Sequence, residues 1–415
     1  MTARRIMVSA YGCEPGKGSE QGVGWNWMLQ LAGMAELVVV TRSNNEASIE
    51  AALPIELKTR VRFEYYDLPS AIRRLKRKEK GLYPYYLLWQ WGAYRRARQL
   101  LREQPFDYAM HLTFGSIWMP TFMHRLPLPF IWGPVGGGEA VPFGLIASLP
   151  LRSRVLQYLR YGLMATFHIN PLFVGVTRRA CIILARTEDT ARMIPSRHAG
   201  KVRVILETAV ANEWMDVELA RDGMAAEGRP VQVIYTGRLV AFKNVAVAIC
   251  AIAMARRRGT DLHLCIVGDG PQRGPLQILA IQEGVADQVT FTGMISQAEV
   301  MAALRGSDIY LLPSLREGGV WSLIEAMALA LPVVCVNTSG MAVIADAESA
   351  VLVEPSSQQQ MIDDFSSALQ GLAGSPERRM ELGRHARKRI EKHFLWQHKG
   401  DFMADLFDEL EQTRQ

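Results

Sequence analysis

Two carboxylates frame a glycine pair that follows an apolar run. Residues 309–314 are predicted to form a strand, and Glu317, Gly318 and Gly319 come just after it. Glu325 lies eight residues beyond Glu317, where a helix is predicted to open. The N-terminus of a helix offers unpaired N–H groups and a positive dipole end, which suit phosphate, and glycines let the backbone approach a ligand closely. The two carboxylates can accept hydrogen bonds from the hydroxyls of a sugar and a ribose.

The same residues also allow a structural interpretation. Ser322 precedes Glu325 by three residues, which is the spacing of a capping box. In that interpretation Glu325 only closes the first turn of the helix.

A basic pair follows another predicted strand, 231–237. Arg238 comes directly after Gly237, and Lys243 lies five residues farther on. A guanidinium and an ammonium group at a strand end can neutralise a diphosphate leaving group. Surface basic residues are common, so the pair gains weight only from its position upstream of the two carboxylates.

A glycine-rich loop, 14–22, separates the first predicted strand from the first helix and contains Gly16 and Gly18. Such a loop can close on a phosphate or an acceptor. It is not G-x-G-x-x-G, and residues 36–42 do not end in the acidic residue that an NAD ribose requires. An ordinary turn between strand and helix would not need so many glycines.

For two further positions, the residues alone do not decide between a functional and a structural role. His111 lies near the end of the predicted strand 108–114, where a lone histidine is often structural. Glu139 ends a second glycine-rich turn, 133–139, and can either bind an acceptor hydroxyl or cap that turn.

The elements that must position these residues alternate. Short apolar, β-branched runs alternate with longer helical patterns in both halves of the chain, which predicts parallel sheets covered on both faces. The fold expected is α/β, with two Rossmann-like domains facing a central cleft. We place an N-terminal domain at 1–208, a C-terminal domain at 209–390 and a helix packing back onto the body at 391–415. Ligand sites of such domains lie at the carboxyl ends of the strands.

Composition narrows the class of protein. The 415 residues are 49% hydrophobic and 21% charged, as in ordinary globular proteins. Five cysteines without a CxxC pair exclude a disulfide scaffold and a cysteine zinc site and suggest a reducing compartment. The N-terminal apolar stretch is too short for a signal peptide, and we expect no membrane-spanning segment.

Basic charge is concentrated in residues 70–100, which hold nine Lys or Arg and one acid, Glu79. The run 73–80 leads into the aromatic-rich stretch 83–96. This composition suits an anionic membrane surface, and it equally suits a solvated basic helix followed by an aromatic core helix. Nucleic-acid binding ranks lower because no nucleic-acid-binding motif accompanies the patch.

The Glu317…Glu325 pair has the E-x7-E spacing of retaining glycosyltransferases of the GT-B fold, and the chain resembles glycosyltransferase family 4. The resemblance covers nearly the whole chain and is strongest over 231–355. It implies that Glu317 contacts the donor sugar, that Glu325 contacts the ribose, and that Arg238 and Lys243 bind the diphosphate. The chain departs from the family pattern E-G-aromatic-G, because its aromatic residue, Trp321, is displaced.

The resemblance assigns further contacts around the donor. It implies that the amides of 318–320, Val320 included, face the phosphates, and that Gly268 and Met294 lie near the nucleotide. It sets Gly16 and Gly18 beside donor phosphates and acceptor, His111 close to the donor sugar, and Glu139 in a segment found in a subset of the family. The strict D-x-D pair that holds a metal ion in the other main glycosyltransferase fold is absent from the sequence, so no metal is expected.

The sequence therefore predicts a retaining, metal-independent glycosyltransferase with a UDP- or GDP-linked sugar as substrate and no other cofactor. The expected acceptor is a lipid-linked or membrane-proximal glycan of a cell-surface polysaccharide. The expected location is cytoplasmic, with peripheral attachment to the inner face of the plasma membrane through residues 70–100. The alternatives are a soluble small acceptor, a nucleotide-sugar epimerase of the same fold and a catalytically silent scaffold.

Overall fold

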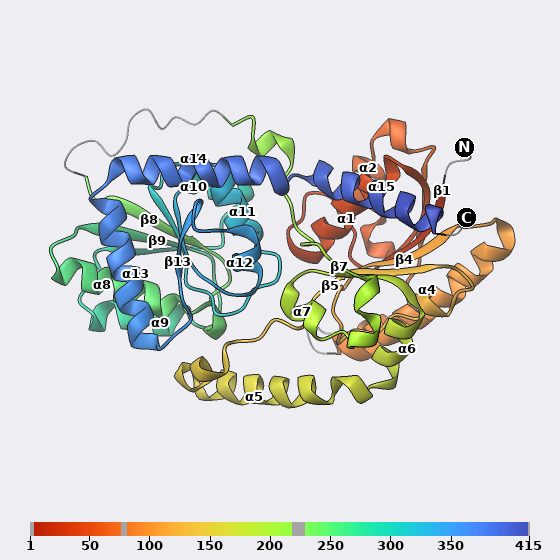
Figure 1. Cartoon of the computed structure of the whole chain (residues 1–415), viewed down its shortest axis with the longest axis horizontal. Helices are drawn as coiled ribbons and strands as arrows, with labels where there is room; N and C mark the ends of the chain where they lie inside the picture. Colours follow the sequence, from red (N-terminus) through yellow and green to blue (C-terminus); the bar gives the residue numbers. More distant parts are fainter. Residues whose placement is uncertain (1–3, 76–80, 218–228, 414–415) are drawn as a thin grey trace. The chain divides into compact units, whose positions relative to one another are not determined.

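The computed structural model describes residues 4–75, 81–217 and 229–413. Within these residues the chain divides into two compact units (Figure 1). Unit 1 comprises Met1–Gly138, Met164–Thr208 and Trp396–Gln415, and unit 2 comprises Glu139–Leu163 and Ala209–Leu395.

Unit 1 is built on a seven-stranded sheet in the order β3-β2-β1-β4-β5-β6-β7 among the residues described, with every pair parallel. The strands are β1 (Arg4–Ala10), β2 (Ala35–Thr41), β3 (Val61–Tyr65), β4 (Tyr108–Thr113), β5 (Phe130–Val135), β6 (Ala180–Ala185) and β7 (Val202–Val204). The order reverses between β1 and β4, which is the switch point where open parallel sheets bind ligands.

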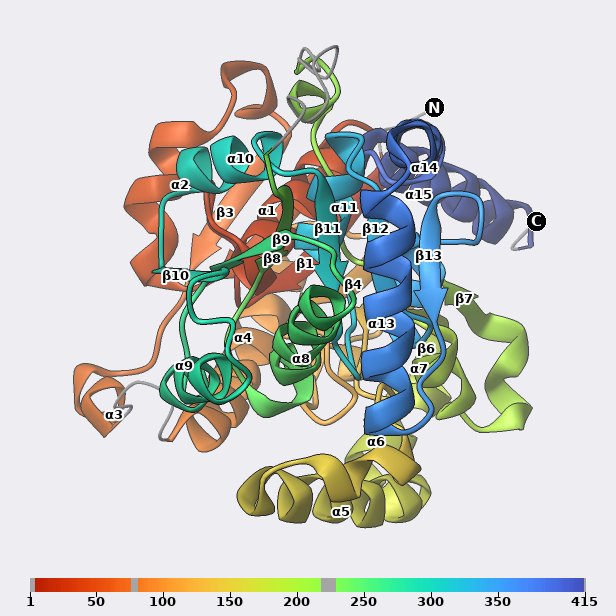
Figure 2. The same cartoon turned by 90° about the vertical axis from the view of Figure 1, so that its left-hand side faces the viewer.

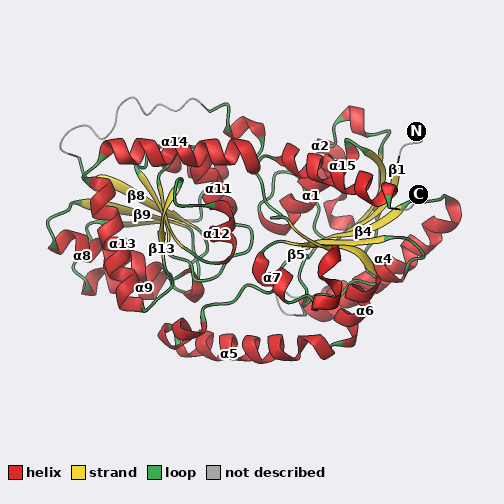
Figure 3. Ribbon diagram, in the orientation of Figure 1, coloured by secondary structure: helices red, strands yellow, loops and turns green. Residues whose placement is uncertain are grey.

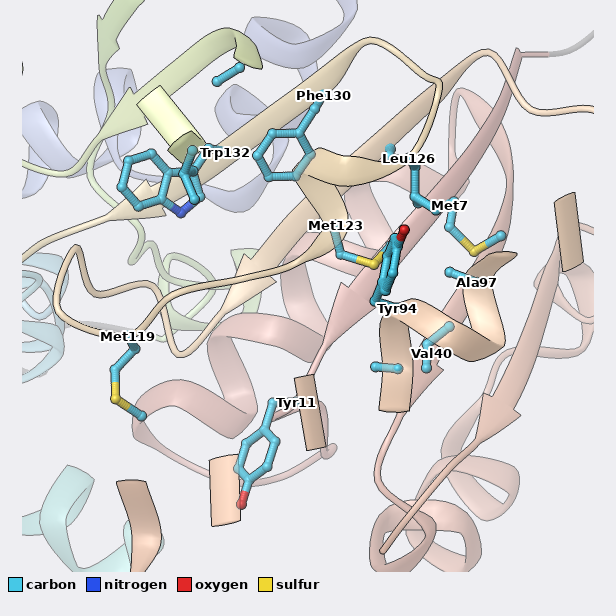
Figure 4. Close-up of a cluster of buried hydrophobic side chains, with 14 of the residues drawn as sticks. Met7, Tyr11, Val40, Tyr94, Ala97, Met119, Met123, Leu126, Phe130 and Trp132 are labelled. Carbon is cyan, nitrogen blue, oxygen red and sulfur yellow. The ribbon is translucent and has the colours of Figure 1, made fainter. Parts of the chain in front are cut away.

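The helices that follow these strands are α1 (Ser19–Ala32), α2 (Glu46–Ala52), α3 (Ser70–Leu75), α4 (Leu82–Glu103), α6 (Pro171–Arg179) and α7 (Glu188–Arg192). Another helix, α5 (Leu151–Thr166), runs from unit 2 into unit 1. Figure 4 shows part of the core of unit 1, where Tyr94 and Ala97 of α4 lie close to Met7 and Val40 of the sheet. The buried face of α4 thus covers the sheet with aromatic and small side chains.

Unit 2 has a six-stranded parallel sheet in the order β10-β9-β8-β11-β12-β13 in the described part of the chain. Its strands are β8 (Val231–Thr236), β9 (Leu262–Val267), β10 (Val289–Gly293), β11 (Ile309–Leu312), β12 (Val333–Val336) and β13 (Ala350–Val353). Here the order reverses between β8 and β11. The two sheets confirm the predicted α/β fold with two Rossmann-like domains (Figure 3).

Helices cover the sheet of unit 2 (Figure 2). They are α8 (Val245–Arg257), α9 (Arg273–Gln282), α10 (Gln297–Arg305), α11 (Trp321–Ala328), α12 (Ser339–Ile344), α13 (Gln358–Ala373) and α14 (Pro376–His393). α8 packs against α13, and α11 packs against α14. The central strands β11 and β12 are continuous, fully buried apolar runs because both faces of a parallel sheet are covered there.

Three strands were not predicted from the sequence: β3, β7 and β13. β3 reads Val-Arg-Phe-Glu-Tyr and is an edge strand with mostly half-exposed side chains, so it has no continuous apolar run. β7 has only three residues and also lies at an edge. β3 and β7 become strands by pairing with β2 and β6, and not because of their own composition.

The domain bounds differ from the predicted ones in two places. Residues 139–163, assigned to the N-terminal domain by sequence, cluster with unit 2. Gln157 of α5 accepts a hydrogen bond from Arg316 of that unit. The last helix, α15 (Trp396–Gln412), begins five residues later than expected, since α14 continues to His393. α15 packs against α1 in unit 1, and Arg4 of β1 forms ion pairs with its Asp408 and Glu411.

Most of the basic aromatic segment 70–100 lies in the helix α4. Tyr85, Tyr86 and Trp89 are buried in the core, whereas Tyr83 and Trp91 are exposed. The aromatic core helix is thus confirmed for the inner face of α4. Residues 76–80, which carry most of the basic run, lie outside the described residues. Among the helices of the described residues, none is both long enough and apolar enough to cross a membrane.

Candidate functional site

Three turns of unit 2 meet at the carboxyl edge of its sheet. The amide of Gly237, after β8, donates to the carbonyl of Val267, and the amide of Gly268 donates to the carbonyl of Gly293, both over 2.9 Å. Gly268 has a φ of +132°, and a Cβ there would lie 2.1 Å from the carbonyl oxygen of Gly237. Only glycine allows this approach. The structure thus brings together the predicted turns around Gly237 and Gly268, with Met294 exposed directly after β10.

The predicted cation and carboxylate are partners. Lys243, in the turn after β8, forms an ion pair with Glu317, in the turn after β11. Both side chains are largely buried, at 15% and 10% exposed, so the pair is shielded from water. A backbone hydrogen bond of 2.9 Å from Leu315 to Phe242 joins the same two turns. β8 and β11 are neighbours in the sheet, so the pair lies at the switch point of unit 2.

Arg238 occupies the same turn as Lys243 and is exposed. The carbonyl oxygen of Arg238 accepts a hydrogen bond of 3.4 Å from the hydroxyl of Tyr235. The turn therefore presents one exposed guanidinium next to one ammonium group already held by a carboxylate.

The glycine turn after Glu317 lies against the N-terminus of α12. The amide of Gly340 donates to the carbonyl of Glu317 over 3.1 Å. A Cβ at Gly340 would lie 1.6 Å from the carbonyl oxygen of Gly318, so the two segments pack backbone to backbone. Sequence reasoning missed Gly340, whose only signal was a Ser-Gly pair after the predicted strand 332–336.

The capping box expected at Ser322 and Glu325 does not form. α11 begins at Trp321, its N-cap is Val320, and no side chain caps it. Ser322 instead accepts a hydrogen bond of 2.8 Å from the hydroxyl of Tyr310, because that strand residue lies directly beneath the first turn. The interpretation of Glu325 as a cap is therefore wrong.

Glu325 lies on α11, and its side chain is half-buried. Burial raises its pKa from the ordinary 4.5 to about 7. None of the described residues donates a hydrogen bond to it, whereas buried carboxylates normally have such donors. A carboxyl group in this state can accept from a hydroxyl pair of a ligand.

The displaced aromatic residue has an anchoring contact. The indole N–H of Trp321 donates to the carbonyl of Ala209 over 2.5 Å. This bond holds the start of α11 against the segment that enters unit 2. The departure from the family pattern is thus explained by a backbone contact of the ring.

Arg316 precedes Glu317 and is enclosed by protein. Its guanidinium lies 4.3 Å from the ring centroid of Phe242 and donates over 3.4 Å to the side-chain oxygen of Gln157 in α5. Burial, followed by the nearby cation Arg160, lowers the pKa of Arg316 to about 10. Glu139 is also buried in this region, and its backbone carbonyl accepts two hydrogen bonds from Arg160.

In unit 1 the predicted glycine loop is exposed. Gly16 has a φ of +65°, and Gly18 is the N-cap of α1. Behind the loop, α1 lies close to the strand end, since a Cβ at Gly24 would be 2.0 Å from the carbonyl oxygen of Gly12. The loop therefore projects from a tightly packed base.

His111 is fully buried within β4. Its Nε2 lies 3.4 Å from the hydroxyl of Tyr86, which accepts from the amide of Gln90 over 3.0 Å. Burial, only partly offset by hydrogen bonding to the backbone of Phe114, lowers the pKa of His111 to about 3. The imidazole is therefore neutral and belongs to an interior polar chain.

A charged group at the carboxyl edge of the unit 1 sheet was missed by sequence reasoning. Arg186, after β6, pairs with Glu207 over 2.8 Å and lies 3.7 Å from Glu20. Glu20 also accepts from the amide of Phe114 over 3.0 Å. Among the described residues, no three metal-ligating side chains lie together as a cation site would require.

Comparisons with known proteins bear on the family and the fold. Residues 216–389 match the family described as glycosyl transferases group 1. The 2-deoxystreptamine glucosyltransferase of Streptomyces kanamyceticus is 27% identical over 286 residues, which is 66% of this chain and 70% of that protein. The chain spans about half the length of the other curated relatives that it matches.

Two solved structures share the fold. The lipopolysaccharide outer core galactosyltransferase WaaB is 15% identical with a TM-score of 0.65, and the match covers 98% of this chain and 99% of WaaB. The Anabaena protein HepE, solved with UDP, is 13% identical with a TM-score of 0.60, covering 98% of this chain and 100% of HepE.

Proposed function

From the match of residues 216–389 to the glycosyl transferases group 1 and from the GT-B fold, we propose that the chain is a glycosyltransferase that transfers a hexose from a nucleotide sugar to a glycan acceptor. In this proposal the transfer retains the configuration at the anomeric carbon. The donor is UDP- or GDP-linked, and no other cofactor takes part.

One observation carries the proposal: the ion pair between Lys243 and Glu317 at the switch point of unit 2. With Arg238 in the same turn, it sets two cations beside a carboxylate and a glycine turn. We assign the diphosphate to Arg238, Lys243 and the amides of 318–320, and the donor sugar hydroxyls to Glu317. The ribose is assigned to Glu325, whose carboxyl group lacks a donor among the described residues.

The remaining predicted contacts stand as parts of this proposal. Gly237 and Gly268 line the nucleotide with Met294 near the base. The loop with Gly16 and Gly18 lies beside the phosphates and the acceptor in the active state. Glu139 binds the acceptor, and His111 supports the sugar through the wall that it stabilises, since its side chain is fully buried.

In the proposed reaction the bond between the anomeric carbon and the diphosphate oxygen breaks. The acceptor oxygen forms the new glycosidic bond on the same face, and its proton passes to the leaving phosphate. The nucleoside diphosphate departs. Arg238 and Lys243 stabilise the charge that develops on the diphosphate, which is usually a large contribution to catalysis. These cations and the helix end make the transfer independent of a metal.

For the acceptor we propose a lipid-linked or membrane-proximal glycan of a cell-surface polysaccharide, reached from the cytoplasmic side. The exposed Tyr83 and Trp91 of α4 and the basic residues of 70–100 support this. A soluble acceptor is the second candidate, favoured by the likeness to a glucosyltransferase that is named for 2-deoxystreptamine.

Binding of UDP, GDP and ADP by calorimetry tests the donor site. We expect one nucleotide to bind selectively, and Glu325→Ala to lose that binding while Glu381→Ala, an exposed glutamate of α14, retains it. Failure of all three nucleotides to bind would overturn the donor assignment. Product formed from the nucleotide sugar without an acceptor would favour an epimerase, and the anomeric proton of a transferred sugar, read by NMR, tests retention.

A further inference from the structure

The helix α5 (Figure 1, yellow helix) carries exposed aliphatic side chains along one side. Its exposed aliphatic residues include pairs three and four positions apart, and together they occupy one side of the helix. They are Leu151 at 71% exposed, Val155 at 49%, Leu156 at 63%, Leu159 at 59% and Leu163 at 58%. Contiguous exposed apolar surface of this kind marks an interaction site.

The polar side of α5 faces the protein instead. Gln157 is buried and accepts from Arg316, and Tyr161 donates its hydroxyl to the carbonyl of Val141 over 2.8 Å. Arg160 donates to the carbonyl of Glu139. These three residues recur at i, i+3 and i+4, so they share the inner side. An ordinary surface helix has the opposite arrangement, with apolar residues inward.

An adjacent aromatic residue extends the apolar surface. Phe143 is 62% exposed, and its ring centroid lies 5.7 Å from that of Tyr158, which is itself exposed. Amphipathic rings at the edge of an apolar surface suit the level of lipid headgroups.

The charges of α5 select among occupants. The helix contains no acidic residue, and of its three arginines Arg160 is bonded inward, Arg154 is half-buried and Arg152 is exposed beside the leucines. Cations beside a leucine-rich side are typical of helices that lie in an anionic membrane interface. A second copy of this chain docked on the same side would bring the two copies of Arg152 to one interface, and like charges oppose that contact.

We infer that α5 is an interfacial helix whose leucines enter the headgroup–acyl boundary of an anionic phospholipid membrane while the exposed Arg152 beside them meets the phosphates. The inference extends the membrane part of the proposed function to a segment outside residues 70–100. The contact between Gln157 and Arg316 ties this helix to the residue that precedes Glu317. A lipid-borne acceptor would therefore be met at the same surface that holds the enzyme.

Co-sedimentation with phosphatidylcholine vesicles, with and without phosphatidylglycerol, tests this inference on the full chain. We expect the wild-type protein to bind the anionic vesicles and to be released by high salt. The double variant Leu156→Glu/Leu159→Glu should lower the bound fraction by about tenfold or more. The matched control is Ile278→Glu/Ile281→Glu, which alters two exposed isoleucines of α9 and should bind as the wild type does.

Three results would overturn the inference: wild-type protein that ignores anionic vesicles, an α5 variant that binds them undiminished, or a wild-type dimer that the α5 variant dissociates. Nucleotide binding by calorimetry on the same samples separates this test from the proposed function. An α5 variant that binds nucleotide but not vesicles supports the inference. Wild-type protein that binds vesicles but no nucleotide counts against the donor site alone.

Discussion

Lys243 and Glu317 form a shielded ion pair that joins the turns after two neighbouring strands of one sheet. Each is held by its own turn, and the backbone bond from Leu315 to Phe242 fixes the distance between those turns. In the proposed function, an incoming diphosphate competes with the carboxylate of Glu317 for the ammonium group of Lys243.

Replacing the cation tests that competition directly. We expect Lys243→Met to lower the transfer rate about 100- to 1,000-fold, because one electrostatic stabiliser of the leaving group is lost. It should also lower the free energy of unfolding by about 2–4 kcal/mol, since Glu317 stays buried without its partner. Steady-state kinetics and urea denaturation measure both effects. Lys388→Met, at an exposed position of α14, should change neither.

Replacing the carboxylate should separate binding from transfer. Glu317→Gln frees Lys243 from its competing anion, so we expect nucleoside diphosphate to bind at least as tightly as in the wild type. Transfer should nevertheless fall by about 100-fold because the donor sugar loses an oriented acceptor of hydrogen bonds. Calorimetry measures nucleotide binding and steady-state kinetics measures transfer, both on one preparation. A parallel loss of binding and transfer would show that Glu317 contacts the nucleotide instead of the sugar.

The carboxyl group of Glu325 predicts a dependence of stability on pH. Its pKa is about 7 in the folded protein against an ordinary 4.5. The folded state therefore holds a proton that the unfolded state releases, and this group's contribution to stability falls as pH rises from 4.5 through 7. The loss is at most roughly 3 kcal/mol.

We expect Glu325→Gln to remove that dependence, so the variant gains stability over the wild type above pH 7 and not at pH 4.5. Thermal denaturation across this range measures it. Nucleotide binding by the wild-type protein should strengthen as pH rises through 7, because the ionised group is the better acceptor for ribose hydroxyls. Identical pH profiles for wild type and variant would contradict the assignment.

Gly340 tests the packing of α12 on the glycine turn. A methyl group there would collide with the carbonyl oxygen of Gly318, so we expect Gly340→Ala to displace the turn. The free energy of unfolding should fall by about 2–4 kcal/mol, with loss of nucleotide binding. Gly371→Ala is the matched control, because nothing lies within 4 Å of a Cβ at that helical position. That control should gain up to about 1 kcal/mol.

His111 predicts an effect of opposite sign on acidification. Its pKa is about 3 in the folded protein and near 6.5 when unfolded. The unfolded state therefore takes up the proton first, and stability is lost as pH falls below 6.5. His111→Gln should reduce this loss, by about 2 kcal/mol at pH 5, whereas His168→Gln at an exposed position should not. Denaturation at pH 7.5 and pH 5 measures the difference.

The sequence predicted the parts of the fold that depend on continuous apolar runs. β11 and β12 are such runs, β8 and β9 are mostly apolar, and parallel pairing puts the turns that follow these strands at one edge. The proximity of Gly237, Gly268 and Glu317 followed from that rule. The edge strand β3 could not be predicted in the same way, because its half-exposed charged residues resemble a loop.

Contacts between distant segments were beyond the sequence. Ser322 has the spacing of a helix cap, yet its hydroxyl oxygen accepts a hydrogen bond from the hydroxyl of Tyr310 in β11. The partners of Arg316 come from the turn after β8 and from α5, which no local pattern reveals. The pattern of α5 itself is amphipathic, but only the structure shows which side is inward.

The return of α15 to unit 1 affects synthesis of the protein. Unit 1 contains residues from both ends of the described chain, and Arg4 of its first strand pairs with Asp408 and Glu411 of its last helix. On a ribosome, the segments that precede residue 208 emerge first and wait without this helix. Unit 2 can complete its sheet in the meantime. The half of the protein that is translated first is therefore the half that finishes folding last, and until then the face of α1 awaiting α15 is open to chaperones.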